Sequence, residues 1–189
     1  MSSRKKIFNI LEWLVALFLL SICIYYYIFS LNSFTAINAF RASEKSLHYG
    51  PSEIKKEINL KNGKMYLDKY KDWISATPIE RTFIIWYPSS GGGGFPINYS
   101  EKISHTWQCA SMGDKSYIYT VFGYVNDLRI KTVNLKIEEK GKKNTMKYYI
   151  GPDKMFIFCW DDNEVKSKLI SLSGLDKDGR VVYDYKYPN

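Results

Sequence analysis

The stretch that orders the rest of this chain is residues 7–31, which read IFNILEWLVALFLLSICIYYYIFSL. The basic run Arg4-Lys5-Lys6 stands directly before it, and no charged residue occurs between Glu12 and Arg41. A helix needs about 20 mostly apolar residues to cross roughly 30 Å of hydrocarbon, so this segment is long enough to span a bilayer. The sequence therefore predicts a single transmembrane helix over residues 7–31, preceded by a short tail, residues 1–6.

The distribution of basic residues predicts the orientation of this helix. Arg4-Lys5-Lys6 and the amino terminus lie on one side, whereas Arg41 and Lys45 lie on the other side and farther from the apolar run. Positive charge near a membrane span is retained in the cytoplasm. We therefore expect a single-pass protein of the cell membrane, with a cytoplasmic N-terminus and with residues 32–189 outside.

Two processing alternatives stay open for the same segment. A cleaved signal peptide needs a shorter apolar core and small residues at the cut, and Ile37-Asn38-Ala39 matches that pattern poorly. A lipoprotein signal would use Cys23, since Leu20-Ser21-Ile22-Cys23 resembles a bacterial lipobox. That motif requires a small residue before the cysteine, where this chain has Ile22.

The remainder of the chain is basic and poor in cysteine. The net charge of the whole chain is +8, and setting aside Arg4-Lys5-Lys6 and Glu12 leaves +6. Such a balance favours anionic surroundings, namely lipid headgroups or a wall polymer. Solvation of lysines that are spread along the whole chain is the simpler explanation. An external location argues against nucleic acid. Cys109 and Cys159 predict either one disulfide or two buried thiols.

Residues 32–50 predict a juxtamembrane helix, either separate from the membrane span or continuous with it. Apolar and charged residues recur there at spacings of three and four, and Asn32 or Ser33 is a suitable N-cap. Pro51 ends this pattern because it cannot continue a helix. From residue 51 to residue 189 the pattern changes to short strands, which we interpret as one external domain.

The expected strands are separated by turn residues at intervals of about ten. Asn62-Gly63 predicts a type I′ hairpin turn, and Ser89–Phe95, SSGGGGF, predicts an irregular loop. Within residues 129–138 the apolar side chains of Ile130, Val133, Leu135 and Ile137 predict an inward face. The expected strands cover residues 53–60, 65–70, 81–87, 105–112, 116–125, 129–138, 145–150, 154–160, 166–173 and 180–187. Many short strands without intervening helices predict a mainly β, antiparallel sandwich or barrel.

The second half of the chain resembles a known structural pattern. GYVND at residues 123–127, the alternating strand that follows, and the turn Asp176-Lys177-Asp178-Gly179 are similar to the Ig-like β-sandwich that ends many exported bacterial proteins. HYGPSEI and SATPIER resemble uncharacterised small membrane-anchored proteins of Gram-positive bacteria. The resemblance implies a location and an Ig-like ectodomain, and it implies no activity.

The chain offers few residues for catalysis or metal binding. His48 and His105 are its only histidines, and neither is spaced as part of a zinc motif. His105 precedes Cys109 by four residues, which on a strand places the two side chains about 13 Å apart. The run Gly91–Gly94 lacks the lysine and the serine or threonine of a phosphate-binding loop. We predict no catalytic residue, no cofactor and no metal site.

The chain contains three weaker candidate binding sites. Asp176 and Asp178 suggest a calcium loop, but its later ligand positions are occupied by Arg180 and Tyr187, so a hairpin turn is the better interpretation. A second acidic turn, residues 161–164, would bind calcium only weakly. Four tryptophans offer flat surfaces for the sugar rings of a wall glycan, although core packing is the simpler role for most of them. They are Trp73, Trp86, Trp107 and Trp160.

These observations predict a single-pass membrane protein whose external domain binds a partner without catalysis. The expected partners are the lipid bilayer and an envelope protein or an anionic wall polymer; no small-molecule substrate is indicated. An envelope lipoprotein and a regulatory single-span subunit of a membrane assembly are the alternatives. An envelope enzyme would require a cleft that gathers carboxylates around His48 or His105.

Overall fold

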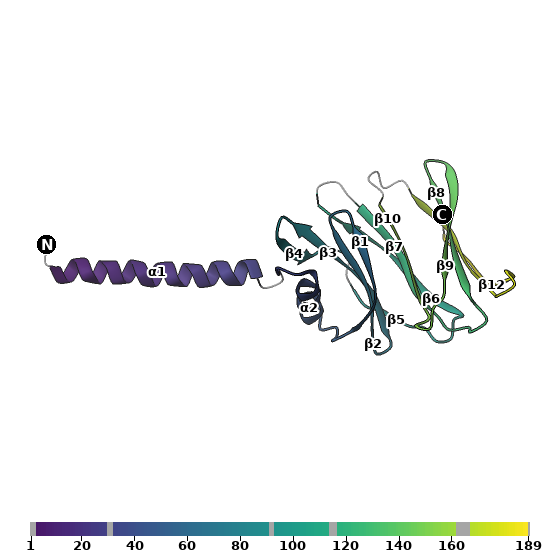
Figure 1. Ribbon diagram of the computed structural model, residues 1–189, viewed down its shortest axis with the longest axis horizontal. Helices are drawn as coiled ribbons and strands as arrows, with labels where there is room; N and C mark the ends of the chain where they lie inside the picture. Colours follow the sequence, from purple (N-terminus) through teal and green to yellow (C-terminus); the bar gives the residue numbers. More distant parts are fainter. Residues whose placement is uncertain (1–2, 30–31, 91–92, 114–116, 162–166, 189) are drawn as a thin grey trace.

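The computed structural model describes residues 3–29, 32–90, 93–113, 117–161 and 167–188, with side chains within the first helix described for residues 9–26. Helix α1 (Ser3–Phe29) extends away from a body built of strands, as Figure 1 shows. A second helix, α2 (Ala36–Ser46), packs against that body. The chain is thus mainly β and antiparallel, with one long apolar helix at its N-terminus.

Twelve strands follow α2 in the described residues. The first five are β1 (Glu53–Leu60), β2 (Gly63–Tyr70), β3 (Trp73–Thr82), β4 (Ile85–Pro88) and β5 (Phe95–Pro96). The other seven are β6 (Ile103–Ser111), β7 (Tyr117–Val125), β8 (Thr132–Glu139), β9 (Lys142–Tyr149), β10 (Met155–Asp161), β11 (Lys168–Leu175) and β12 (Val181–Lys186).

These strands form three antiparallel sheets. The first sheet has the order β1-β2-β3-β4, with β5 paired to β3. The middle sheet has the order β10-β7-β6, and the third sheet has the order β12-β11-β8-β9. In Figure 1 the three sheets are stacked, with the first sheet next to α1 and the third sheet at the far end.

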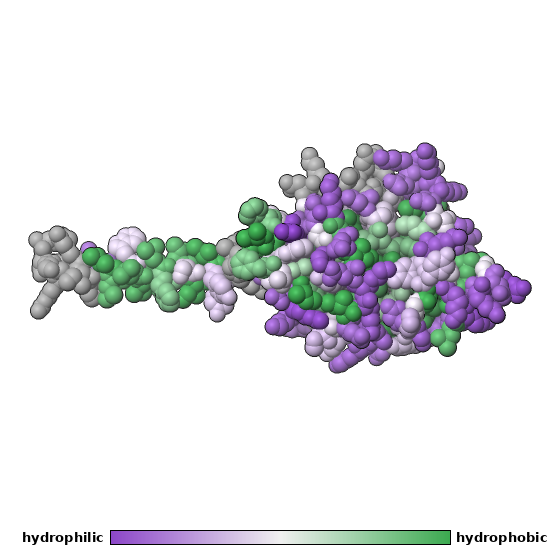
Figure 2. Space-filling model, in the orientation of Figure 1, coloured by the Kyte–Doolittle hydropathy of each residue, from purple (hydrophilic) through white to green (hydrophobic). Residues whose placement is uncertain are grey.

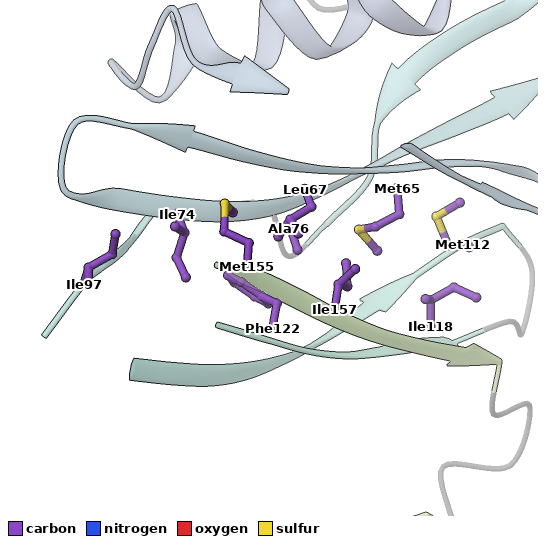
Figure 3. Packing of buried hydrophobic residues seen from close by; sticks show 10 residues of the cluster. All are labelled: Met65, Leu67, Ile74, Ala76, Ile97, Met112, Ile118, Phe122, Met155 and Ile157. Carbon is purple, nitrogen blue, oxygen red and sulfur yellow. The ribbon is translucent and has the colours of Figure 1, made fainter. Parts of the chain in front are cut away.

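The middle sheet is covered on both faces, which makes it the centre of the stack. Figure 3 shows one apolar cluster, in which side chains of the first sheet meet those of β7 and β10. It includes Met65, Leu67, Ile74, Phe122 and Met155, all nearly inaccessible to water. This is why β7 and β10 read as almost continuous apolar runs, whereas a strand with one wet face alternates.

A second apolar cluster joins the middle sheet to the third sheet. Val121 and Phe158 contribute to it from the middle sheet, and Val133, Leu135 and Ile137 contribute from β8. Ile130, directly before β8, is also buried in this cluster. The inward face predicted from the sequence of this segment is therefore confirmed, although β8 itself begins only at Thr132.

Helix α2 covers the outer face of the first sheet. Its Ala39 and Phe40 are fully buried, and the Phe40 ring lies 4.9 Å, centroid to centroid, from that of Tyr66 on β2. The helix is shorter than the predicted residues 32–50, and its N-cap is Thr35, whose hydroxyl accepts a hydrogen bond from the amide of Asn38. The prediction of Asn32 or Ser33 as the cap was wrong because Ser33 pairs instead with Trp86 on β4.

The first hairpin forms where expected but with another turn. Leu60 pairs with Gly63, so Lys61 and Asn62 are the two central residues, and neither has a positive φ. The predicted type I′ turn at Asn62-Gly63 is therefore wrong. Gly63 is needed for space instead, because a Cβ there would collide with the backbone carbonyl of Ile79 on β3.

The segment Arg81–Tyr87 was predicted as one strand, and this prediction was wrong. It contains the end of β3, a tight turn at Phe83-Ile84 and the start of β4. Phe83 adopts a positive φ of 57°, which bulky residues rarely do, so nothing in the sequence signals a turn. Strand β3, which pairs with β2, β4 and β5, was not predicted over most of its length.

The remaining strand predictions are confirmed to within a few residues. Strand β1 has the predicted bounds, and β2 and β6 to β12 each overlap the predicted segment. The loop predicted at Ser89–Phe95 contains Gly91 and Gly92, which lie outside the described residues; Phe95 begins β5. The mainly β, antiparallel character expected from the sequence is confirmed, and the strands form three sheets with a helix over the first.

Candidate functional site

The two histidines lie in different parts of the stack. His48 is exposed, with a positive φ of 52°, in the turn after α2. His105 lies on β6 between the middle and third sheets, where the rings of Tyr183, Tyr185 and Tyr187 surround it at centroid distances of 6.3, 4.7 and 5.9 Å. Burial lowers the pKa of His105, so its imidazole is held neutral among aromatic edges. The sequence did not reveal this cluster, because β6 and β12 belong to different sheets.

The two cysteines of the domain are kept apart by the middle sheet. Cys109 pairs with Tyr119 and Cys159 pairs with Thr120, so they flank β7 on either side. Neighbouring positions of a strand face opposite ways, which places the two thiols on opposite faces of the sheet. Of the two alternatives, separate half-buried thiols are therefore observed. Burial raises the pKa of Cys159 to about 11, which makes it a poor nucleophile.

The acidic turns behave as ordinary turns where they are described. Asp176 uses one carboxylate oxygen to accept the backbone amides of Asp178 and Arg180, both at 2.9 Å, which closes the β11–β12 hairpin. Asp161 ends β10, and residues 162–164 lie outside the described residues. Within the described ranges, no three His, Cys, Asp or Glu side chains are grouped so as to hold a metal ion.

A buried carboxylate beneath α2 was not foreseen. Asp68 on β2 is fully buried, and no donor of the described residues makes a hydrogen bond of normal geometry to either of its oxygens. Burial raises its pKa to about 7; the nearby charge of Glu44 adds to this, while Tyr49, Ser52 and Arg41 counteract it. In the sequence Asp68 stands beside Lys69, which resembles a pair of charged surface residues, so its burial was not predicted. The only signal for burial of Asp68 is its apolar neighbours Tyr66 and Leu67.

The neighbouring carboxylate is fully paired. Glu44 on α2 accepts hydrogen bonds from the Arg41 guanidinium and from the backbone amide of Ser52, both at 2.7 Å. Arg41 also donates to the carbonyl of Ser52 at 2.9 Å. These hydrogen bonds connect the end of α2 to the start of β1. Arg41, Glu44 and Ser52 therefore stabilise the position of the helix on the domain.

The most distinctive surface is the outward face of the third sheet, which we call the lysine face. Because Val133, Leu135 and Ile137 point inward, their neighbours on β8 point outward. Strand pairing then places five lysines on that face: Lys136, Lys143, Lys147, Lys168 and Lys186. Two carboxylates, Glu138 and Asp184, share it.

The charges of the lysine face are ordered by the register. Glu138 stands between Lys143 and Lys168, whereas Lys136 and Lys186 flank the uncharged Ser171. Directly opposed residues of neighbouring strands lie about 5 Å apart, so these cations form a compact array. None of the five lysines forms a salt bridge with another described residue, which leaves an excess of positive charge for a partner.

Two hollows adjoin this face. One has a volume of about 700 Å³ and lies over Lys136, Lys143 and Lys186. The other, of about 350 Å³, is lined by aromatic side chains, among them Trp107 and Tyr119 of the middle sheet. Lys168, Leu169 and Tyr187 line both hollows, so the aromatic hollow opens directly beside the lysine face.

The four tryptophans divide into two exposed and two packed side chains. Trp107 and Trp73 are 53% and 44% exposed, and each lines a hollow. Trp160 stacks on Tyr119 at 5.7 Å between centroids, and Trp86 packs beneath the Arg81 guanidinium. Stacking of sugar rings therefore stays a prediction for Trp73 and Trp107 alone.

The hollow around Trp73 lies on the other side of the molecule, beside the first sheet. It measures about 370 Å³ and is bordered by His48, Tyr49, Tyr70 and Lys71. Gly94, the last residue of the glycine run, lies against Tyr49 and Trp73. Gly93 and Gly94 thus contribute to an aromatic hollow of the surface, and they are followed by strand β5 instead of a phosphate-binding helix.

No protein family, no curated protein and no solved structure matches this chain.

Proposed function

We propose that this chain is a single-pass protein of the cell membrane, with its N-terminus in the cytoplasm and its strand-built domain outside. The observation that carries the proposal is the state of α1: none of the 18 residues Asn9–Tyr26 is buried, and the side chains are mostly apolar. Figure 2 shows this hydrophobic surface along the helix. A core helix of a soluble protein would be covered by its own domain, so lipid is the natural environment for α1.

We propose further that the external domain is a binding module without catalysis, and that its partner is an anionic polymer of the envelope. The support is the lysine face, where five lysines outnumber two carboxylates and none forms a salt bridge with a described residue. Unpaired cations on a broad face attract polyanions over several ångströms, and salt weakens the attraction.

The position of the lysine face favours a polymer over lipid headgroups. The chain enters the domain at the first sheet, where Ser33 pairs with Trp86. The lysine face is the outer surface of the third sheet, two further layers away, and stacked sheets lie about 10 Å apart. With α1 in the bilayer, this face looks away from the membrane, as the arrangement in Figure 1 suggests.

We also infer that β6 to β12 form an Ig-like unit. Three of these strands form the middle sheet and four form the third sheet. The chain crosses from the middle sheet to the third sheet between β7 and β8. It returns to the middle sheet between β9 and β10, and it crosses to the third sheet again between β10 and β11. Such repeated crossing between two packed sheets is typical of Ig-like sandwiches. The resemblance to small membrane-anchored Gram-positive proteins remains a proposal of the same kind.

The anchor and its orientation are tested on membranes of expressing cells. We expect the intact chain to stay with the membrane in alkaline carbonate and to keep the full mass of its sequence. Asp178→Cys, in a chain whose Cys23, Cys109 and Cys159 are replaced by alanine, should react with a membrane-impermeant thiol reagent on intact cells. Release by carbonate would contradict the anchor, and a shortened or lipid-modified chain would support a signal peptide or a lipoprotein.

Polyanion binding is tested with immobilised polyphosphate and the detergent-solubilised chain. Replacing both Lys136 and Lys186 with glutamine should weaken binding by about tenfold or more at low salt, since each basic residue contributes about 1 kcal/mol near an anionic surface. The matched control replaces Lys45 at the end of α2 and Lys61 in the β1–β2 turn, two exposed lysines outside the third sheet, and changes the net charge equally. Equal losses in both pairs would show that net charge alone matters and would contradict a defined face.

A further inference from the structure

The β3–β4 hairpin ends in two large apolar residues that the domain does not cover. Phe83 and Ile84 form its two-residue turn, and they are 87% and 53% exposed. A hairpin turn facing water is normally polar or glycine-rich. Phe83 also holds a positive φ of 57°, a conformation that glycine or asparagine would adopt with less strain. Strained backbone is often retained where a side chain serves a function.

The turn lies beside the point where the chain leaves α1. Ser33 follows the last residue of α1, Phe29, by four positions, and it exchanges two backbone hydrogen bonds with Trp86, of 2.8 and 2.7 Å. Trp86 is two residues from Ile84, so the tip of the hairpin is held close to the end of the helix. Figure 1 shows β3 and β4 at the edge of the domain nearest to α1, and Figure 2 shows hydrophobic surface there.

The residues that flank the tip are those expected at a membrane surface. Trp86 and Tyr87 follow it on β4, and such side chains are enriched at the boundary between lipid and water. Arg81 precedes it on β3, donates from Nε to the carbonyl of Phe83 at 3.0 Å, and lies over the Trp86 ring. A guanidinium in this position suits lipid phosphates, while the two apolar side chains extend beyond it.

We propose that the Phe83-Ile84 tip inserts into the outer boundary of the bilayer that holds α1, as a second contact between the domain and the membrane. This inference rests on the proposed membrane anchor. Two points of attachment, the helix and the hairpin tip, fix the tilt of the domain, so the lysine face is held away from the lipid. The partner is the lipid surface itself, since α1 would bring it within reach of the tip.

The test places an environment-sensitive fluorophore at the tip of the full chain, reconstituted into phosphatidylcholine–phosphatidylglycerol vesicles. Phe83→Cys and Ile84→Cys are labelled in the chain whose three native cysteines are replaced by alanine. The control is Tyr149→Cys, because Tyr149 is 78% exposed on β9 of the third sheet. We expect the label at 83 or 84 to show blue-shifted emission and quenching by lipids that carry a nitroxide at the headgroup. The label at 149 should show neither effect.

The outcomes separate this inference from the anchor. If the chain resists carbonate extraction from these vesicles while the label at 83 is as water-exposed as the label at 149, the insertion of the tip is overturned and the anchor stands. If the chain is released by carbonate, both are overturned. Phe83→Ser combined with Ile84→Ser provides the complementary measurement: a label at Tyr87→Cys should lose its lipid quenching when the two apolar side chains are absent.

Discussion

At the scale of single residues, Asp68 is the most informative side chain. Its carboxyl is fully buried without a well-formed hydrogen bond, and burial raises its pKa to about 7. A carboxyl whose folded pKa exceeds its unfolded value binds more protons in the folded state, so folding stability declines as the pH rises. The decline should begin near pH 4, the ordinary value for Asp, and should be complete somewhat above pH 7.

Asp68→Asn should remove this decline, because an amide carries no charge that burial would penalise. At pH 8 we expect the variant to be more stable than the native chain by about 2 kcal/mol or more, and near pH 4 the difference should be small. Urea unfolding of the detergent-solubilised chain, followed by tryptophan fluorescence across this pH range, measures both curves. Asp178→Asn in an exposed turn is the control. Parallel pH curves for native chain and Asp68→Asn would refute the assignment.

At Gly63 the surrounding atoms leave no room for a side chain, which allows a prediction about stability. A Cβ at this position would collide with the backbone carbonyl of Ile79, which cannot rotate away as a side chain would. Gly63→Ala should therefore destabilise the first sheet by about 1–3 kcal/mol, the usual cost of overpacking. Gly93→Ala, where an added Cβ meets no atom within 4 Å, is the matched control. The midpoint of urea unfolding gives the comparison, and equal midpoints would contradict the collision.

At the scale of elements, α2 is stabilised by its contact with the first sheet more than by its own sequence. Phe40 is fully buried against Tyr66, whereas Ile37 on the same helix is 40% exposed. Phe40→Ala should cost about 3–5 kcal/mol of unfolding free energy, because it leaves a cavity in a packed contact. Ile37→Ala should cost less than half as much. Urea unfolding distinguishes the two, and similar losses would mean that helix propensity decides.

The elements also show what the sequence can reveal. Strand β1 and the alternating β8 were predictable because local pattern and burial agree. The turn at Phe83-Ile84 was not predictable, because two consecutive apolar residues in a sequence normally indicate a buried segment, whereas these two are exposed. The order of the strands in the sheets could not be predicted from the sequence either. The cluster of His105 with three tyrosines forms because β6 of the middle sheet faces β12 of the third sheet.

At the scale of the whole molecule, surface chemistry changes from one end to the other. Apolar side chains cover α1 and the β3–β4 tip, and lysines occupy the outer face of the third sheet. The basic residues were visible in the sequence, but they appeared evenly spread. Only the register of β8, β9, β11 and β12 gathers five of them on one face. The proposed binding role of that face therefore depends on the strand pairing and could not be predicted from the spacing of lysines in the sequence.

This polarity leads to a prediction about α1 itself. If the helix serves only to hold the domain at the membrane, replacing residues 7–31 with an unrelated apolar span of equal length should preserve polyphosphate binding and membrane retention. The lysine face and the hairpin tip are formed entirely by residues after the helix, so their contacts are unchanged by the replacement. Carbonate extraction and polyanion binding on the same membranes measure both properties.

A regulatory subunit that acts through its helix predicts a different result in cells. The domain would stay anchored and bind polymer, yet the exchanged chain would fail to complement a deletion. Complementation by the exchanged span would therefore favour the anchored binding module, because a span that contacts a partner through specific side chains cannot be replaced without losing that contact.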